Sequence, residues 1–208
     1  MAIQTFTAGQ ILTAAQMNTL QQQAVMTFTT EAARDAALTS PTEGMYAYIT
    51  APTVPAATGS ITYVPSGIQT IYNGAVWVCL TAISGFQSGT GTTGSATYTA
   101  SLSGSPGTNV AVTIVTGTTA EITVGASHYI NVAGNDAIVG VAVSGATTLA
   151  ASGTQRLSNA NTNNVQHSYT YILSGLTAGT NVFTLNYIGG STATQTVSNR
   201  TLTVKGVA

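Results

Sequence analysis

The second half of the sequence alternates apolar residues with Thr, Ser or Asn, which is the period of β-strands that have one buried face. The pattern is clearest at residues 128–132, 183–187 and 201–204. Short segments of this kind, separated by Gly- and Ser-containing turns, recur over residues 96–208 without any helical period. We therefore predict a mainly β protein in which residues 96–208 form an antiparallel, jelly-roll-like β-sandwich, because a single sheet would leave its apolar face exposed.

The first forty residues carry the helical pattern of the chain. Residues 14–24 lack Gly and Pro, and Thr13 with Gln16 forms a capping-box pattern at their start. The apolar stripe of this helix, at i, i+3 and i+7, consists of Met17, Leu20 and Ala24. Because the stripe fits heptad positions a and d over less than two heptads, it is compatible with a helix lying on its own domain or with an oligomer seam. A second short helix is predicted over residues 31–38, with Thr30 as its N-cap.

A hairpin signal follows the helices. Two β-rich runs, residues 68–72 and 75–80, are separated by Asn73 and Gly74, the pair favoured in a type I′ turn. We group residues 1–83 into an N-terminal module of two short helices and a small β-hairpin.

Residues 84–95, which read SGFQSGTGTTGS, predict a flexible linker between this module and the β domain. Residues 89–94 match the pattern G-x-G-x-x-G, but a strand candidate follows them where a dinucleotide site needs a helix. We therefore predict no bound cofactor.

Charge is scarce throughout the chain. The 208 residues include 4 Lys or Arg and 5 Asp or Glu, and 44% of residues are apolar. The apolar content indicates a folded chain, and the scattered basic residues argue against nucleic-acid binding. The longest apolar runs, residues 75–80 and 137–143, are too short to cross a membrane, and the amino terminus lacks the pattern of a signal peptide.

Catalytic and metal-binding patterns are also missing from the sequence. Glu121 and Asp136 are the carboxylates of the predicted β domain, and nothing in their spacing supports an acid–base pair. His128 lies on an apolar strand face, which favours a buried, hydrogen-bonded histidine, and Cys79 is expected to be a small buried side chain. We predict no enzyme activity, no catalytic residue and no metal site.

Several segments resemble virion proteins of tailed bacteriophages. Residues 6–18, 31–50 and 71–78 resemble the amino-terminal module of a group that includes minor tail proteins, tail fibres and head fibres. Residues 168–190 and 198–204 are similar to the jelly-roll tips of such fibres, which are commonly trimeric. The resemblance implies a structural component of the virion, made in the host cytoplasm. Since the chain has no extended shaft, it implies a short spike or decoration.

Two functions remain open at this level. In the first, residues 1–83 attach the chain to a capsid or tail protein, and a homotrimer, with Met17, Leu20 and Ala24 as a candidate seam, displays the β domain outward. In the second, the β domain binds a host-surface glycan. The candidate contacts for the glycan, which could also be core residues, are Tyr169, Tyr171 and Tyr187. His167 shares a strand face with the first two, so that face is either core or a binding platform. An enzyme such as a depolymerase is the least supported alternative.

Overall fold

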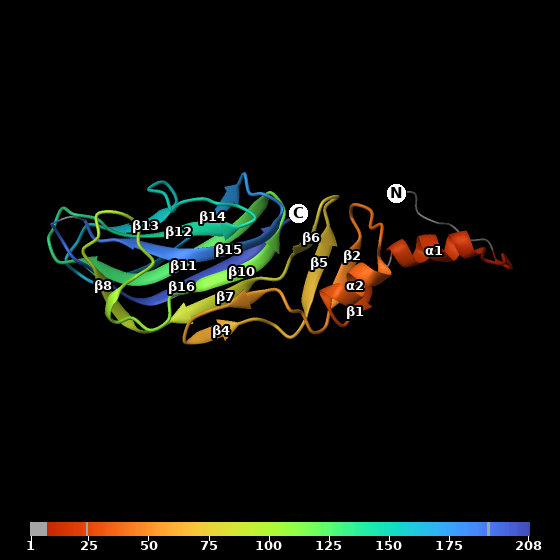
Figure 1. The fold of residues 1–208 in the computed structure, drawn as a ribbon, viewed down its shortest axis with the longest axis horizontal. Helices are drawn as coiled ribbons and strands as arrows, with labels where there is room; N and C mark the ends of the chain where they lie inside the picture. Colours follow the sequence, from red (N-terminus) through yellow and green to blue (C-terminus); the bar gives the residue numbers. More distant parts are fainter. Residues whose placement is uncertain (1–7, 24, 191) are drawn as a thin grey trace.

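The structure, a computed structural model, describes residues 8–23, 25–190 and 192–208. It is mainly β, as predicted, and is elongated, with α1 at one end of the long axis and the β8 region at the other (Figure 1). Among the described residues, no helix has the length and apolar character needed to cross a membrane.

The amino-terminal third forms a small four-stranded sheet with a helix packed on it. The strands of this N-terminal sheet run in the spatial order β1 (Met26–Phe28), β2 (Tyr46–Ile49), β5 (Ile68–Tyr72) and β6 (Trp77–Cys79). β1 pairs with β2 in parallel and the other pairs are antiparallel. Met45, Ala47 and Trp77 form a small core beneath α2, with Leu38 packed against them.

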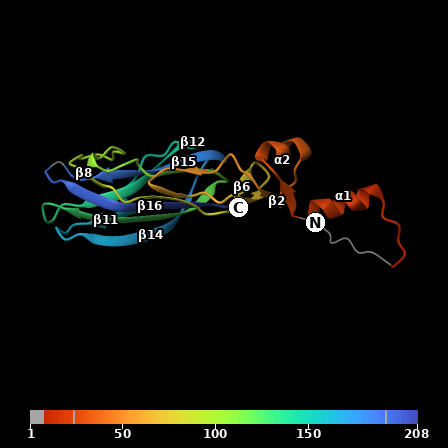
Figure 2. The same cartoon turned by 90° about the horizontal axis from the view of Figure 1, so that it is seen from below.

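Two helices precede or cover this sheet. α1 (Ala14–Gln23) begins after Thr13, whose backbone N–H donates to Gln16 Oε1 at 3.0 Å. α2 (Glu31–Ala37) begins after Thr30, whose Oγ1 accepts from the backbone N–H of Ala33 at 3.2 Å. α1 lies beyond α2, away from the rest of the molecule, in both views (Figures 1 and 2).

The remaining strands build two larger sheets. The five-stranded sheet has the order β13 (Arg156–Asn159), β12 (Ala137–Gly145), β15 (Gly179–Ile188), β10 (Ala111–Thr116) and β3 (Ala56–Ala57). The seven-stranded sheet includes β14 (Val165–Ser174), β11 (Thr119–Ile130), β16 (Gln195–Val207), β7 (Ile83–Gln87) and β4 (Ile61–Tyr63) in that order. Its other two strands are β8 (Thr90–Thr93), which pairs with β16, and β9 (Ser103–Ser105), which pairs with β8.

The antiparallel pairs of these sheets are nested in the sequence. β12 pairs with β13, β11 with β14, β10 with β15, and β7 with β16. The chain is thus arranged like one long hairpin, with its tip between β12 and β13, that has been folded into two layers. In Figure 2 β12 and β15 lie on one side, and β11, β16 and β14 on the other.

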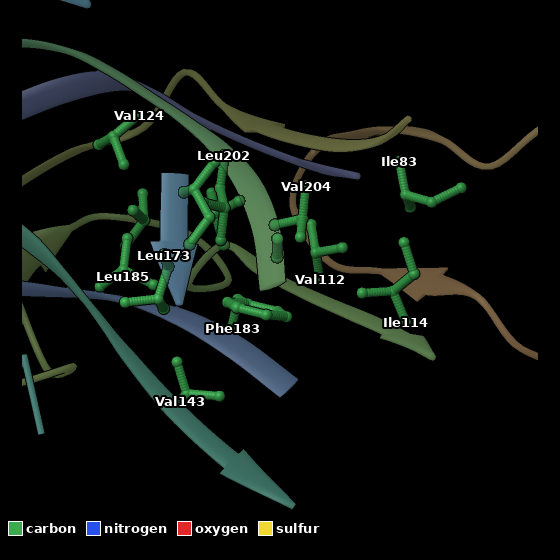
Figure 3. Packing of buried hydrophobic residues seen from close by; sticks show 14 of the residues in the cluster. Ile83, Val112, Ile114, Val124, Val143, Leu173, Phe183, Leu185, Leu202 and Val204 are labelled. Atoms are coloured by element: carbon green, nitrogen blue, oxygen red, sulfur yellow. The ribbon is translucent and has the colours of Figure 1, made fainter. Parts of the chain in front are cut away.

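The two layers share one hydrophobic core. Figure 3 shows Phe183 and Leu185 of β15 close to Leu202 and Val204 of β16, with Val143 of β12 on the far side. The alternation predicted for residues 183–187 and 201–204 is confirmed, because these apolar side chains are buried and the residues between them are mostly not. The core continues through Ile49 and Ile68 into the N-terminal sheet.

A buried arginine, Arg200 of β16, lies beside this core. Arg200 is fully buried and has no carboxylate partner among the described residues. Its Nη1 donates to the Tyr187 hydroxyl at 3.3 Å, and its Nη2 donates to the carbonyls of Gly89 and Pro106. The guanidinium also lies 5.8 Å from the Tyr187 ring centroid. A buried charge needs hydrogen-bond partners, and Arg200 of β16 finds them in Tyr187 of β15 and in the 88–107 segment. The same bonds therefore hold that segment against the two strands.

The predicted linker at residues 84–95 is wrong, because β7 and β8 lie there and pair with β16. Glycine serves close packing here: a Cβ on Gly85 would overlap the Thr58 carbonyl, and one on Gly91 would lie 2.7 Å from the Cβ atoms of Leu102 and Pro106. The prediction that residues 1–83 form a separate module is also wrong. Within this range, β3 pairs with β10 of the five-stranded sheet, and β4 pairs with β7 of the seven-stranded sheet.

Two further local predictions differ from the structure. The connection between β5 and β6 contains four residues, since Tyr72 pairs with Trp77, and only Gly74 of the predicted turn pair has positive φ. A type I′ turn is therefore wrong; Asn73 Oδ1 instead accepts from the backbone N–H groups of Ala75 and Val76. The strand candidate that follows residues 89–94, at residues 96–102, forms an isolated bridge between Thr99 and Tyr187 in place of a strand.

Candidate functional site

The candidate site lies on β14, an edge strand of the seven-stranded sheet that, among the described strands, pairs only with β11. Its alternate residues share the inward face of the sheet: Val165, His167, Tyr169, Tyr171 and Leu173. Leu173 and Tyr171 are buried, whereas Tyr169 is 43% exposed. The apolar face of the strand therefore emerges from the core toward its amino-terminal end.

Tyr169 and Tyr171 form a stacked pair on this strand. Their ring centroids are 5.4 Å apart and the rings are inclined by 23°. Burial raises the pKa of Tyr171 above its usual range, with the neighbouring Tyr169 adding to the shift. Tyr169 thus presents an aromatic face to solvent and is supported from below by Tyr171, which is the arrangement a flat apolar ligand surface would use.

Tyr187 is wrong as a glycan contact. It lies on β15, in the middle of the five-stranded sheet, and is fully buried. Its hydroxyl donates to Asn109 Oδ1 at 2.8 Å, and burial raises its pKa to about 12 although Arg200 acts in the opposite direction. Alternation identified the inward face correctly, but it could not distinguish a central strand from an edge strand.

The two histidines of the chain meet next to the tyrosine pair. His128 of β11 and His167 of β14 have their Nε2 atoms 3.2 Å apart and their ring centroids 4.8 Å apart. His128 is fully buried, and burial together with the nearby His167 lowers its pKa to about 4. The prediction of a buried, hydrogen-bonded His128 is confirmed. His167 is 39 positions further along the sequence, and no local pattern signalled that it would be the partner.

A polar hollow of about 340 Å³ lies on the same two strands and on β16. Its lining, which contains no Asp, Glu, Lys or Arg, consists of Thr123, Gly125, Ala126, Gln166, His167, Ser168, Asn199 and Thr201. The ladder between β11 and β16 has a bulge here, and Asn199 adopts a positive φ of 47°. Gly125 leaves the hollow open, because a Cβ there would lie 3.6 Å from Thr201 Cβ and 3.7 Å from Ser168 Cβ.

The predicted oligomer seam is partly described. Met17 is 45% exposed and Leu20 is half-buried on α1, whereas Ala24 lies outside the described residues. Ile11 and Leu12, which precede the helix, are also exposed. The amino-terminal end of the chain thus presents several apolar side chains to solvent.

The N-terminal sheet has an open face close to α1. Tyr46 and Tyr48 of β2 are exposed there, opposite the face that packs under α2. Together with Val25, Thr27 and Gln69 they line a hollow of about 520 Å³. Edge strand β1 borders this face, and among the described strands it pairs only with β2.

A third hollow, of about 280 Å³, lies between α2 and the ends of β10 and β15. Arg34 is buried there, 4.7 Å from the Trp77 ring centroid, and its Nη2 lies 2.8 Å from Asp35 Oδ1. Cys79 also lines the hollow, and burial raises its pKa to about 11, so the thiol is the buried small side chain predicted from the sequence. Sequence reasoning missed the burial of Arg34, which no local pattern signals.

The two carboxylates of the β domain do not meet. Glu121 is exposed near the beginning of β11, and Asp136 follows the other end of that strand, where its Oδ2 lies 3.7 Å from Arg156 Nη2. A paired-carboxylate site is therefore not formed by these residues. Among the described residues, no group of three or more His, Cys, Asp or Glu side chains is placed to hold a metal ion.

No protein-family model matches the sequence, and no curated protein is significantly similar to it.

Proposed function

We propose that this chain is a structural component of a tailed-phage virion, a short trimeric spike or decoration. In this proposal the N-terminal region, which comprises α1, α2 and the N-terminal sheet, attaches to a capsid or tail protein. The β body, which comprises the five- and seven-stranded sheets, projects outward. The observation that carries the proposal is the asymmetry of the molecule along its long axis. The exposed apolar residues of α1 and of the segment before it, and the open face of the N-terminal sheet, lie toward one end of that axis (Figure 1).

The fold supports the same proposal through its connectivity. Eight strands with nested antiparallel pairs, in the spatial orders β14-β11-β16-β7 and β13-β12-β15-β10, correspond to the jelly-roll arrangement of two Greek keys. We therefore assign the β body to the jelly-roll class of β-sandwiches. This fold is a scaffold with many functions, so the virion role rests on the resemblance and on the molecular polarity.

The surface chemistry of the β body suits an extracellular particle. Of the nine charged residues in the chain, the arginines Arg34 and Arg200 are buried, and three others lie within residues 31–43. A surface dominated by Thr, Ser and Asn has few groups to titrate or to be screened by salt. Low charge also leaves strand edges without lysine protection, and assembly of identical copies around an axis covers such edges.

The proposal is tested by asking whether the chain is part of the particle. Particles purified through a density gradient from the producing cells are expected to contain the chain, as identified by mass spectrometry, at a fixed ratio to the capsid protein. A gradient in which the chain separates completely from the particles would overturn the proposal.

A second candidate function, glycan binding, is favoured by the stacked pair on the free edge of the sheet. Tyr169 offers an exposed ring on which a sugar could stack, with Tyr171 packed against it. Binding to a glycan array that is lost in Tyr169→Ala but retained in Tyr63→Ala would support this function. Tyr63 is a matched control because it is an exposed tyrosine on β4, at the opposite edge of the same sheet.

A further inference from the structure

We propose that His128 and His167 form a binding site for one transition-metal ion of the class that prefers imidazole ligands, such as Zn²⁺ or Co²⁺. The proposal concerns the β body alone and does not depend on the virion role. It rests on the position of the two Nε2 atoms, on the hydrogen-bond partner of His128, and on the different burial of the two rings.

The distance between the nitrogens suits a shared metal ion. Zn–N bonds of about 2.0–2.1 Å place two ligand nitrogens about 3.4 Å apart at a tetrahedral angle and about 2.9 Å apart at a right angle. The observed Nε2–Nε2 distance of 3.2 Å lies between these values. A metal ion can therefore replace the proton between the two rings with little movement of either strand.

The ladder between β11 and β14 holds the two side chains in this position. His167 is opposite Ala126, and His128 is opposite Val165, so the histidines are diagonal neighbours on the same face of an antiparallel pair. Asn159 Nδ2 donates to the backbone carbonyl of His128 at 2.6 Å and fixes that end of β11 against β13. Both ligands therefore stand on paired strands rather than on loops.

Gln195 supplies the partner that a metal-bound His128 needs. Its side-chain amide is fully buried, with Nε2 3.4 Å from His128 Nδ1 and with Oε1 lacking any hydrogen-bond partner among the described residues. Exchanging the two amide atoms by a half-turn places Oε1 beside Nδ1, where it accepts the Nδ1–H. That tautomer leaves the Nε2 lone pair of His128 free for the metal and also satisfies the unpartnered oxygen.

The burial of the two rings defines how an ion reaches the site. His128 is fully buried, whereas His167 is half-buried and stands on β14, an edge strand whose free side borders solvent. Rotation of His167 opens the path, and water fills the remaining coordination positions from that side. The expected complex is thus a two-histidine site completed by solvent.

The test uses the intact, untagged chain after treatment with a chelator. Titration with Co²⁺ is expected to give a visible absorption band that saturates at one ion per chain and is removed by Zn²⁺. Since the chain contains two histidines, metal-dependent shifts of both imidazole rings in NMR spectra assign the ligands.

Three variants separate ligation from fold. His167→Ala and the larger His167→Gln remove the half-buried ligand. Loss of a hydrogen bond that supports a ligand weakens metal binding by about 10- to 100-fold, and both His167 variants are expected to weaken it by more than that. Gln195→Met is expected to weaken binding within that range. Tyr169→Ala, which alters the same strand face two residues away, is expected to leave the affinity unchanged.

Two results would overturn the proposal: no saturable binding of Co²⁺ or Zn²⁺ to the folded chain, or wild-type affinity in a folded His167 variant. Near-UV circular dichroism of each variant establishes that it is folded. If His167→Ala loses its native spectrum, His167→Gln decides the outcome, and the imidazole NMR shifts of the unmodified chain decide it independently.

Discussion

The N-terminal region and the β body are stabilised differently. The β body has a continuous apolar core between two layers, with neutral Thr- and Ser-rich outer faces. The N-terminal sheet has a small core of its own and relies on charged groups at its contacts. Arg34 lies against Trp77, and the Glu31 carboxylate accepts the backbone N–H groups of Thr53 and Val54. Charged side chains thus make contacts on both sides of the small N-terminal core, whereas the β body has one fully buried charge, Arg200, beside a much larger apolar core.

The largest expected effect separates the core of the β body from the open face of the N-terminal sheet. Phe183→Ala removes a fully buried ring between the layers and should lower the free energy of unfolding by about 3–5 kcal/mol. Tyr46→Ala, on the open face of the N-terminal sheet, should change it by less than about 0.5 kcal/mol. Urea denaturation followed by circular dichroism measures both; equal effects would contradict the distinction.

The next effect tests whether residues 84–95 are a packed part of the β body. Gly85→Ala should destabilise the chain by about 1–3 kcal/mol, because the new Cβ overlaps the Thr58 carbonyl and lies 2.9 Å from Val110 Cγ1. Gly94→Ala is the matched control, since the nearest atoms to its Cβ are 3.8 Å away and its φ is not positive. A flexible linker would tolerate both substitutions equally.

A smaller effect should be confined to the N-terminal region. Arg34→Met keeps most of the side-chain volume but removes the cation next to Trp77, which should cost about 1–2 kcal/mol. Trp77 is the single tryptophan of the chain, so its fluorescence reports on this region specifically. If Arg34→Met shifts the unfolding transition seen by Trp77 fluorescence and that of the β body by the same amount, the effect is not confined to the N-terminal region.

The smallest effect is a pH dependence of the same region. Burial raises the pKa of Glu31, but hydrogen bonds from Thr53, from Val54 and from its own backbone outweigh it, so the pKa lies below its ordinary value of 4.5. The stabilisation from the ionised carboxylate is therefore complete well above pH 4.5 and is lost as the pH falls below 4.5 through the folded-state pKa. Unfolding monitored by Trp77 fluorescence should show this loss, and Glu31→Gln should remove it. An unchanged slope in Glu31→Gln would contradict the assignment.

The same comparison explains which features could be predicted from sequence. Alternation predicts the mainly β class and the inward faces of β15 and β16, because it depends only on local residue order. Glycine content does not predict a linker, because Gly85 and Gly91 lack side chains for close packing rather than for flexibility. The contrast between Tyr169 and Tyr187, and the meeting of His128 with His167, depend on strand order and register, which are set by pairing between distant segments.

We propose that the N-terminal end is the assembly end and the β body is the displayed part. Light scattering on a sizing column tests it directly with the intact chain and with the double variant Met17→Glu, Leu20→Glu. We predict three times the 21.0 kDa chain mass for the intact chain, and a single chain mass with unchanged circular dichroism of the β body for the variant. A mass of 21.0 kDa for the intact chain at every concentration, or a trimer that survives both substitutions, would contradict the account.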